Sequence, residues 1–319
     1  MKSTKKLSPD INFNDWCNYW LEITNYSRSL TTNAKYEEII SRVIQPAFDG
    51  KILSQVSYDD IQGFIDGLNV KESRSSMIKA IMKMIMQGAV DHNLITRNPA
   101  SLAQPVKSKR KNIAILNDDD IKALLGLKDE SVYVRALLFT LFLGLRIGET
   151  LGLSWNNVDF EEGNVTISQQ LTSYYKDGKT HNALLPYTKT RENRVLPLPD
   201  IAQDLLTEQQ KFYVDNPDRL VFTDEKGAGI LYAAFYYQFN KLMYRIGRSD
   251  VTPHSLRHTT ATTLLYNTKD IFLVKEVLGH RSLNTTGHYP TVSLQERQIA
   301  AKALDEYFAV YMKEVMTCL

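Results

Sequence analysis

A short basic segment divides this sequence into two unequal parts. Residues 104–112 carry four positive charges and no negative charge, and they follow Asn98-Pro99, a pair that interrupts helices. Helical patterns of apolar residues precede this segment, whereas both helical and strand patterns follow it. At roughly 100–200 residues per domain, a chain of 319 residues accommodates two domains. The sequence therefore predicts an N-terminal helical domain over residues 1–105, a linker over 106–116 and a second domain over 117–319.

The first part of the chain is predicted to form a four-helix bundle. Apolar residues recur every three or four positions in four stretches, as on the buried face of a helix. The expected helices cover about residues 13–23, 31–46, 57–68 and 73–92. Short helices joined by short loops pack into a compact bundle. Met77 and Met84 of the last helix are expected to fill its core rather than to line a binding groove.

The second part is predicted to be mainly helical with a small antiparallel sheet. Residues 158–168 alternate around a Glu-Gly-Asn turn, which indicates a hairpin. A longer polar excursion reaches Lys189 and returns through an apolar stretch at 194–198. Helices are expected at about 118–127, 131–145, 200–213, 232–247, 254–266, 270–278 and 293–316. The predicted fold class is mainly α with a small antiparallel β-sheet.

Composition and motifs argue against several classes of protein. No apolar run reaches the ~18 residues of a membrane span, and the basic N-terminus lacks the apolar core of a signal peptide. Two cysteines, Cys17 and Cys318, cannot build a disulfide framework or a cysteine-rich zinc site, and they suit a reducing cytoplasm. There is no phosphate-binding glycine loop. His254 and His258 are spaced like zinc ligands, but the glutamate of that pattern is missing, so we expect neither a metal nor a cofactor.

The charge distribution suggests a polyanionic partner for the first part. Residues 1–112 hold 16 Lys and Arg against 11 Asp and Glu, a balance of +5, whereas the rest of the chain has a balance of −3. Ordinary solvated faces would give the same numbers. The linker can likewise be a solvated connection or a strap along a phosphate backbone. The second interpretation assigns DNA binding to the basic residues Lys107, Lys109, Arg110 and Lys111.

Several residues of the second part could bind an anion or move a proton. Arg146 stands at a glycine-flanked helix junction, and Glu149 could hold it in place, although such a pair can also be a purely structural salt bridge. His254 and Arg257 lie one helical turn apart near a predicted helix N-terminus, where both could contact one phosphate. His280 follows a predicted helix C-terminus. Tyr289 lies nine residues later and is one of 17 tyrosines.

The order of these residues resembles the active site of the tyrosine recombinases, or phage integrases. Gly144–Leu153 resembles the family's first arginine box, Thr252–Thr259 its second, and Leu278–Tyr289 its tyrosine box. Thr188-Lys189-Thr190, before the strand at 194–198, resembles the hairpin that carries the family's lysine. The similarity covers about residues 12–315. It implies an N-terminal four-helix core-DNA-binding domain and an α+β catalytic domain.

The resemblance also implies a mechanism that uses neither metal nor ATP. Tyr289 would attack a DNA phosphodiester to give a 3′-phosphotyrosine and a free 5′-hydroxyl. Arg146 and Arg257 would clamp the phosphate, and Lys189 would protonate the leaving oxygen. His254 would accept the tyrosine proton or bond the phosphate. The remaining roles are donation to a phosphate oxygen by His280, orientation of Arg146 by Glu149, and support from His258.

The implied partners are double-stranded DNA and other copies of the chain. A homo-tetramer would join two DNA sites, with a monomer or dimer when free, and an accessory directionality factor could take part. The last helix carries an apolar stripe that includes Ile299, Leu304, Phe308 and Val310. The family resemblance implies that this helix docks into a neighbouring protomer, and packing within the chain is the alternative. The expected location is the cytoplasm of a bacterial host, at the nucleoid, with no membrane association.

Two departures keep other functions open. Proline follows Tyr289, where the family often has a polar residue, and no arm-binding domain is evident. Site-specific recombination for a phage or mobile element is the favoured function. A DNA-binding regulator that uses the same fold without recombining is the alternative, and a monomeric type IB topoisomerase-like enzyme is a more distant one.

Overall fold

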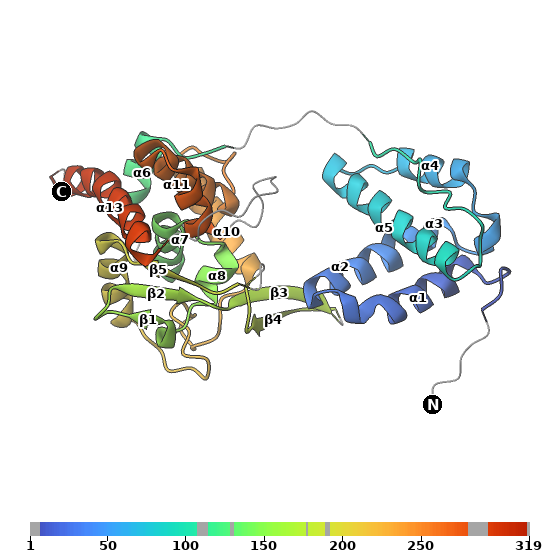
Figure 1. The fold of residues 1–319 in the computed structure, drawn as a ribbon, viewed down its shortest axis with the longest axis horizontal. Helices are drawn as coiled ribbons and strands as arrows, with labels where there is room; N and C mark the ends of the chain where they lie inside the picture. The colour runs from blue at the N-terminus through green and yellow to red at the C-terminus, as the bar shows by residue number, and fades with distance from the viewer. Residues whose placement is uncertain are drawn as a thin grey trace. The chain divides into compact units, whose positions relative to one another are not determined.

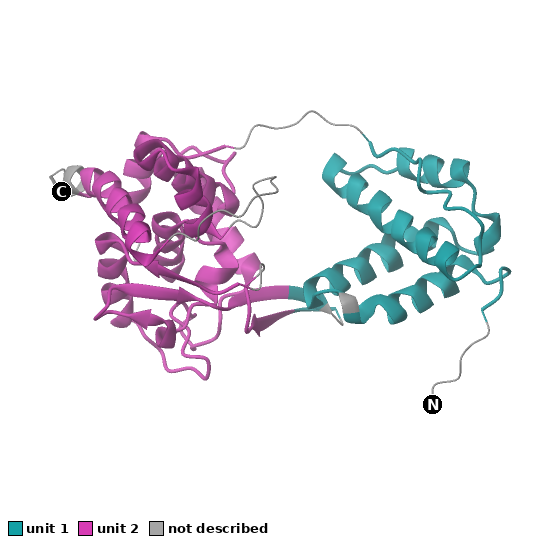
Figure 2. Cartoon of the chain, viewed as in Figure 1, with its two compact units in different colours: residues 1–111, 174–180 teal, residues 112–173, 181–319 magenta. Residues whose placement is uncertain are grey.

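The computed structural model describes residues 7–106, 114–127, 131–176, 178–188, 192–279 and 293–317 (Figure 1). Contacts divide the chain into two units, Met1–Lys111 with Tyr174–Thr180, and Asn112–Ser173 with His181–Leu319 (Figure 2). Each unit has its own hydrophobic core. The predicted fold class, mainly α with a small antiparallel β-sheet, is confirmed. Within the part of the chain that the structure describes, no helix is long and apolar enough to cross a membrane.

Unit 1 is built from short helices around a core of aromatic and aliphatic side chains. Its elements are α1 (Phe13–Thr24), η1 (Asn25–Ser27), α2 (Leu30–Ile39), the π-helical turn η2 (Ile40–Ile44), α3 (Gln45–Ala47), η3 (Leu53–Gln55), α4 (Tyr58–Asp66) and α5 (Glu72–Asp91). Trp16 of α1 is fully buried and donates its indole N–H to the carbonyl of Ile85 at 3.0 Å. The four predicted helical stretches correspond to these elements, with a change of helix type in the second stretch.

The start of α4 shows how the sequence sets one of these boundaries. Ser57 caps the helix, with its hydroxyl accepting the backbone N–H of Asp60 at 3.1 Å. The Asp60 carboxylate in turn accepts the backbone N–H of Ser57 at 3.0 Å. This reciprocal pair satisfies two N–H groups that have no partner within the helix.

For one residue of α5, the predicted position in the core is wrong. The buried face of α5 comprises Ile78, Ile81, Met82, Ile85, Met86 and Ala89. Because this face follows the 3.6-residue period, Met84 falls on the opposite side of the helix and is exposed. Met77 is partly buried against the core. The methionines do fill the core, but through Met82 and Met86.

Unit 2 surrounds the apolar helix α7 with other helices and a sheet. Its elements are α6 (Asp118–Leu125), α7 (Val132–Leu143), α8 (Ile147–Leu151), η4 (Trp155–Asn157), β1 (Val158–Asp159), β2 (Asn164–Ile167), β5 (Arg194–Pro197), α9 (Asp200–Gln210), α10 (Tyr232–Arg245), α11 (Pro253–Thr268), α12 (Ile271–Leu278) and α13 (Leu294–Thr317). Two further strands, β3 (Gln170–Lys176) and β4 (Lys179–Leu185), belong partly to unit 2 and partly to unit 1, which includes Tyr174–Thr180. Eight residues of α7 are buried, and α8, α9, α10 and α11 pack against it. The predicted helices of this part are all present.

Among the described residues, the strands form two small sheets. β1, β2 and β5 make an antiparallel sheet in which Val158 lies opposite Val165, and Ile167 lies opposite Arg194. The predicted hairpin at 158–168 is therefore confirmed. The polar excursion before Lys189 contains a second sheet, of β3 and β4, which the sequence pattern does not reveal because much of β4 is exposed and has no apolar face.

Helix α13 packs on the core of its own unit. Leu304 and Phe308 of the predicted stripe are buried there, together with Ala300 and Tyr311. The Tyr307 hydroxyl donates to the Asp118 carboxylate of α6 at 2.9 Å. Ile299 and Val310, the other ends of the predicted stripe, are exposed. Exchange of this helix between protomers stays a prediction.

Candidate active site

The junction between α7 and α8 places Arg146. Gly144 ends α7 in the left-handed conformation, with φ of +63°. A Cβ at this position would lie 2.5 Å from the Leu278 side chain and 3.1 Å from that of Thr260, so only glycine fits. The absent side chain lets α11 and α12 approach the end of α7. Arg146 then follows in extended conformation as the cap of α8.

Glu149 holds Arg146 from within the unit. Its side chain has no solvent exposure. It accepts the Arg146 guanidinium at 2.8 Å (Nη1 to Oε1) and the Arg146 backbone N–H at 3.1 Å. The predicted pairing of these two residues is therefore present. Burial opposes ionisation of this carboxyl, but the charges and hydrogen bonds of Arg194 and Arg146 outweigh it and lower the pKa of Glu149.

Arg194, at the start of β5, is a residue of this site that the sequence analysis does not predict. Its Nη2 lies 2.7 Å from Glu149 Oε2, and its Nη1 lies 3.3 Å from Oε1. Its side chain is 7% exposed. The sequence offers one indication of its role, because Arg194 is a cation at the start of a short apolar strand. A charge that is buried in such a strand needs an oppositely charged partner.

Helix α11 presents His254, Arg257 and His258. Pro253 occupies the first turn, and Thr252 and Ser255 form a reciprocal cap, which sets the helix start where the sequence predicts it. His254 is exposed, and its ring meets that of His258 edge-on at a centroid distance of 4.7 Å. Burial and the Arg257 charge lower the pKa of His258, which favours its neutral form.

Arg257 is almost completely buried, at 1% exposure. Its Nη1 donates to the Gly144 carbonyl at 2.9 Å and its Nη2 to the Leu278 carbonyl. Its Nε is buried and has no hydrogen-bond partner among the described residues. Burial and the Arg146 charge, helped by Arg194 and opposed by Glu149, lower the pKa of Arg257 to about 9. The guanidinium therefore stays protonated at neutral pH, and an anion beside it would be strongly stabilised.

The C-terminus of α12 joins the three arginines. Three consecutive carbonyl groups there each accept one guanidinium N–H. The bonds run from Arg194 Nε to Val277 O at 3.1 Å, from Arg257 Nη2 to Leu278 O, and from Arg146 Nη2 to Gly279 O at 3.1 Å. The last carbonyls of a helix lack partners within it and carry the negative end of the helix dipole, so they attract cations.

We refer to Arg146, Arg194, Arg257 and Glu149 together as the arginine site. Three guanidinium groups and one carboxylate leave it a formal charge of +2. Gly279 ends α12 with φ of +65°, and a Cβ there would lie 3.2 Å from Arg194 Nη1. The site is thus closely packed, and its excess positive charge suits a phosphate.

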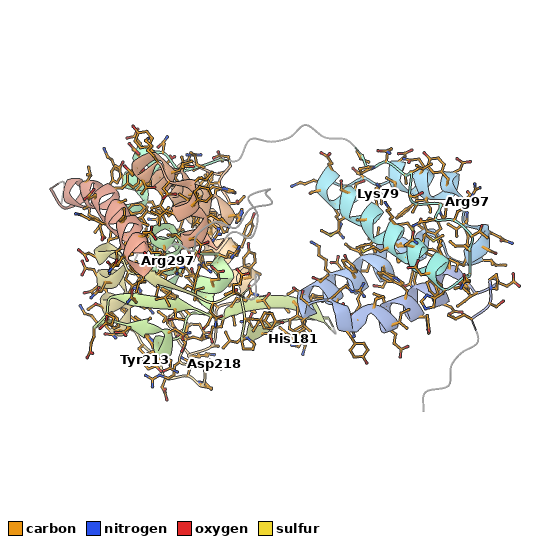
Figure 3. All side chains as sticks on the ribbon, viewed as in Figure 1. Lys79, Arg97, His181, Tyr213, Asp218 and Arg297 are labelled. Atoms are coloured by element: carbon orange, nitrogen blue, oxygen red, sulfur yellow. The ribbon has the colours of Figure 1, made fainter. Side chains whose placement is uncertain are left out.

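A second set of contacts ties α13 to the elements that form this site. Arg297, in the first turns of α13 (Figure 3), donates to the carbonyl of Val195 at 2.8 Å and lies 3.6 Å from the Glu276 carboxylate. Val195 is the neighbour of Arg194 on β5, and Glu276 precedes Val277 on α12. The start of α13 therefore contacts both β5 and α12, the two elements that carry Arg194 and its carbonyl partner.

Several predicted site residues lie outside the described residues. These are Lys189, His280, Tyr289 and the basic linker residues Lys107, Lys109, Arg110 and Lys111. The chain on either side of the lysine segment is joined by a hydrogen bond from the Thr188 hydroxyl to the Glu192 carbonyl at 3.0 Å. Within the described ranges, no group of three or more His, Cys, Asp and Glu side chains is arranged to hold a metal ion.

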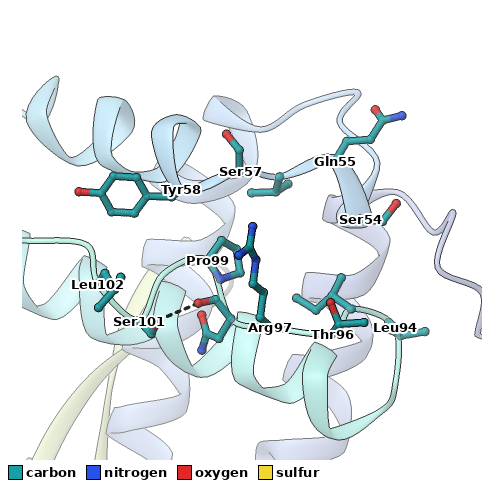
Figure 4. A pocket seen from close by; sticks show the side chains of 13 residues that line it. Ser54, Gln55, Ser57, Tyr58, Leu94, Thr96, Arg97, Pro99, Ser101 and Leu102 are labelled. Atoms are coloured by element: carbon teal, nitrogen blue, oxygen red, sulfur yellow. Dashed lines mark hydrogen bonds between the residues drawn. The ribbon is translucent and has the colours of Figure 1, made fainter.

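A separate cavity of about 650 Å³ lies in unit 1, at the start of α4 (Figure 4). Arg97 points into it between Ser57 and Pro99 (Figure 4), and Ser101 closes one side through a hydrogen bond to the Asn98 carbonyl at 2.8 Å. None of the predicted catalytic residues lines it.

Comparison with known proteins identifies the family. The model of the phage integrase family matches residues 114–296, more than half of the chain. The chain belongs to the phage integrase family. The family's N-terminal SAM-like domain matches residues 12–69, which lie in unit 1. The predicted family, and with it the predicted class of enzyme, a site-specific tyrosine recombinase, is confirmed.

Curated relatives cover most of the chain at modest identity. A XerC-like tyrosine recombinase of Caldanaerobacter subterraneus is 26% identical and covers 94% of this chain and 84% of its own length. Tyrosine recombinase XerC of Herpetosiphon aurantiacus is 29% identical, over 75% of this chain and 77% of its own. Tyrosine recombinase XerD of Neisseria meningitidis serogroup B is 26% identical, over 81% and 84%.

Solved structures share the fold. A lambda integrase dimer bound to a core site has a TM-score of 0.70 at 15% identity, and covers 89% of this chain and all of the solved one. The integrase of transposon Tn1549 in complex with a circular intermediate DNA has a TM-score of 0.68 at 18% identity, over 91% and 99%. The fold thus extends over both units.

Proposed function

We propose that this chain recombines DNA at specific sites by forming a 3′-phosphotyrosine through Tyr289. The observation that carries the proposal is the arginine site, which gathers Arg146 and Arg257 at the end of α12, in a chain of the phage integrase family. His280 directly follows this helix end in the sequence, and Tyr289 lies nine residues further on. The helix end that gathers the arginines is therefore followed in the sequence by both proposed catalytic groups.

Arg146 and Arg257 are suited to stabilise a reacting phosphate. Arg146 is 21% exposed while Glu149 fixes its orientation, so it combines access with rigidity. Arg257 is buried, and its Nε has no partner among the described residues. Such preorganised cations stabilise the charge that develops on the non-bridging oxygens in the transition state. No step in this scheme needs a metal, since the guanidinium groups supply the positive charge.

Proton transfer would be shared among three further residues. A tyrosine hydroxyl has a pKa near ~10, so Tyr289 needs nearby cations and a base to become a nucleophile. His254 is exposed on α11, one turn from Arg257, where it would accept this proton or bond the phosphate. Lys189 would protonate the leaving 5′-oxygen, and His280 would donate to a phosphate oxygen. His258 would support His254 through the contact of their rings.

DNA binding would involve both domains and the segment between them. We propose an N-terminal core-binding domain over residues 1–105, a linker over 106–116 and a catalytic domain over 117–319. Lys107, Lys109, Arg110 and Lys111 of this linker would contact phosphates. Since phosphate contacts release counterions, affinity would fall steeply with salt concentration.

Assembly would follow the related structures. Lambda integrase has been solved as a dimer on a core site and as a tetramer on a Holliday junction. We propose that this chain likewise forms a tetramer on two DNA sites and is a monomer or dimer when free, with α13 docking into a neighbour and an accessory protein setting the direction. The activity would place it with the DNA of a bacterial host.

Recombination is favoured over the regulatory alternative. The relatives that match along most of the chain carry the names of recombinases and integrases. A regulator would have no need of a buried cationic cluster, because the cost of burying it brings no gain in DNA affinity that surface cations could not supply.

The test is covalent capture of DNA. Purified chain and its Tyr289→Phe variant are incubated with fragmented genomic DNA of the host and denatured in detergent, and the DNA that stays attached is sequenced. We expect fragments that share one sequence with the wild type, and none with the variant, although both retain that sequence in native pull-down. Enrichment in native pull-down without any detergent-resistant DNA would establish the regulator instead. Relaxation of supercoiled DNA without sequence preference would establish the topoisomerase-like activity.

A further inference from the structure

Arg194 joins three segments of the catalytic unit. Its guanidinium bonds both carboxylate oxygens of Glu149, on α8, at 2.7 and 3.3 Å. Its Nε donates to the Val277 carbonyl at the end of α12 at 3.1 Å. Its backbone belongs to β5 and pairs with Ile167 on β2. One side chain therefore links the sheet, α8 and the helix end that precedes His280.

Every side-chain nitrogen of Arg194 donates a hydrogen bond to the protein. Each of the three has an acceptor within the unit, and the side chain is 7% exposed. Arg257, in contrast, keeps one nitrogen without a partner among the described residues, and Arg146 is 21% exposed. This difference separates Arg194 from the two arginines proposed to bind phosphate.

Glu149 depends on Arg194 for its geometry. Its two oxygens accept four N–H groups, two from Arg146 and two from Arg194. A buried carboxylate with this many donors has one stable orientation, since any rotation leaves a charged group unpaired. Without Arg194, Glu149 would lose one of its two guanidinium partners, and the fixed position of Arg146 would be lost with it.

Arg194 also lies close in sequence to the proposed general acid. Thr188 and Glu192, which flank Lys189 in the sequence, are joined by a hydrogen bond of 3.0 Å, and β5 begins two residues after Glu192. Gly279 leaves room for the Arg194 guanidinium, because any Cβ there would lie 3.2 Å from Nη1. Arg194, the first residue of β5, therefore links this part of the sequence to the end of α12 through its bond to the Val277 carbonyl.

We propose that Arg194 is a positioning residue for the recombination reaction. It acts through Glu149 to hold the Arg146 guanidinium against the end of α12, without touching the DNA phosphate itself. The inference rests on the proposed function, because the reaction that Arg194 supports is the cleavage of DNA by Tyr289.

The experiment measures DNA cleavage in a double-mutant cycle. The substrate is a nicked duplex that carries the sequence recovered by covalent capture, and single-turnover formation of the covalent complex gives both a rate and the fraction of active molecules. The variants are Arg194→Gln, Arg194→Lys, Glu149→Gln and the double variant Arg194→Gln/Glu149→Gln. The matched control is Arg248→Gln, which removes another carboxylate-paired arginine of unit 2, bonded to Asp250 and Asp120.

We expect the rate to fall at least tenfold in Arg194→Gln and in Glu149→Gln, with DNA affinity within threefold of the wild type. The double variant should be within about twofold of the slower single variant, because the two residues act as one unit. Arg194→Lys should also lose at least fivefold, since a single nitrogen cannot reproduce the planar fork of three nitrogens that reaches Glu149 and the Val277 carbonyl. Arg248→Gln should keep the wild-type rate.

Three results would overturn the inference. The first is a normal rate in Arg194→Gln with fewer active molecules, which indicates a structural role alone. The second is a double variant that loses the product of the two single losses, because Arg194 would then act independently of Glu149. The third is full activity of Arg194→Lys, which decides the matter even if Arg194→Gln does not fold. A wild-type chain that forms no covalent complex refutes the proposed function itself and removes the basis of the inference.

Discussion

The core of unit 1 and the arginine site of unit 2 are both deeply buried, but they are built from opposite materials. The largest fully buried side chains of unit 1 are Trp16, Phe13 and Phe48. Among the described residues, the buried charged side chains all belong to unit 2, and they are Asp120, Glu149, Arg194 and Arg257. Asp120 caps α6 and pairs with Arg248, which is a structural role. The other three form the arginine site.

This contrast shows that the arginine site contributes less to the stability of the fold than an apolar core does. Burial of apolar side chains stabilises a fold directly, at about 25 cal/mol per Å². Burial of ions costs free energy that their mutual attraction recovers only with nearly complete hydrogen bonding. The arginine site meets this condition through Glu149 and the carbonyls of α12. It nevertheless retains an excess charge of two cations and an Arg257 Nε that has no partner among the described residues. A fold selected for stability alone has no reason to keep that excess.

Trp16→Ala should cause the largest loss of stability, confined to unit 1. Loss of a fully buried aromatic side chain costs about 3–5 kcal/mol, and the Ile85 carbonyl also loses its donor. Hydrogen exchange followed by mass spectrometry should show faster exchange in α1, α2 and α5 and unchanged exchange in α7, α11 and α12. Tyr26→Ala, which removes a 94% exposed ring, is the control and should change neither unit. Equal acceleration in both units would contradict the separation of the two cores.

Arg257→Lys should reverse this pattern, with little change in exchange and a large loss of activity. A lysine keeps the charge, but its single nitrogen cannot take the places of Nη1, Nη2 and Nε, which donate to Gly144, donate to Leu278 and remain for a phosphate. The rate of covalent complex formation should fall by about 10²–10³-fold, the usual cost of removing one preorganised donor. Arg248→Lys, at an arginine that pairs with Asp120 and Asp250 instead of with the arginine site, should retain the rate. A rate within threefold of the wild type in Arg257→Lys would exclude Arg257 from the reaction.

The smallest expected effect is a dependence of stability on pH through His258. Burial and the Arg257 charge lower the pKa of this residue in the folded chain below the ~6.5 of an unfolded chain. As pH falls through about 6.5, the unfolded state therefore takes up a proton first, and the free energy of unfolding decreases until the folded residue also protonates. Urea unfolding of wild type and His258→Asn at pH 5 to 8 should show a steeper decrease in the wild type. If the free energy of unfolding changed equally with pH in both proteins, the arginine site would not affect the protonation of His258.

The sequence predicts most of the fold because helix boundaries are set locally. Ser57 with Asp60, and Pro253 with Thr252, mark helix starts through their own side chains. The strands β3 and β4 were not predicted, since their pairing depends on a partner strand rather than on an apolar face. The phase of α5 was partly misassigned because methionine is as acceptable on the surface as in the core, as Met84 shows.

The order of residues along the chain predicts most of the site. It does not predict Arg194, because the partners of Arg194 are far away in the sequence. Arg146, His254 and Arg257 stand in short motifs with their neighbours, so spacing identifies them. Arg194 contacts Glu149, 45 residues away, and Val277, 83 residues away. No local pattern encodes such contacts, and only the folded chain brings them together. The sequence does not predict the role of Arg297 either, since its partners lie far away in the sequence, on β5 and α12.

The most direct test of the account is to locate the covalent bond itself. The DNA complex of the wild-type chain is digested with nuclease and trypsin, and the remaining nucleotide is mapped by tandem mass spectrometry. Trypsin should release the peptide of residues 282–297, between Arg281 and Arg297. The account predicts a nucleotide joined through its 3′-phosphate to Tyr289 in this peptide. A nucleotide on any other of the 17 tyrosines, or on a serine, would contradict it.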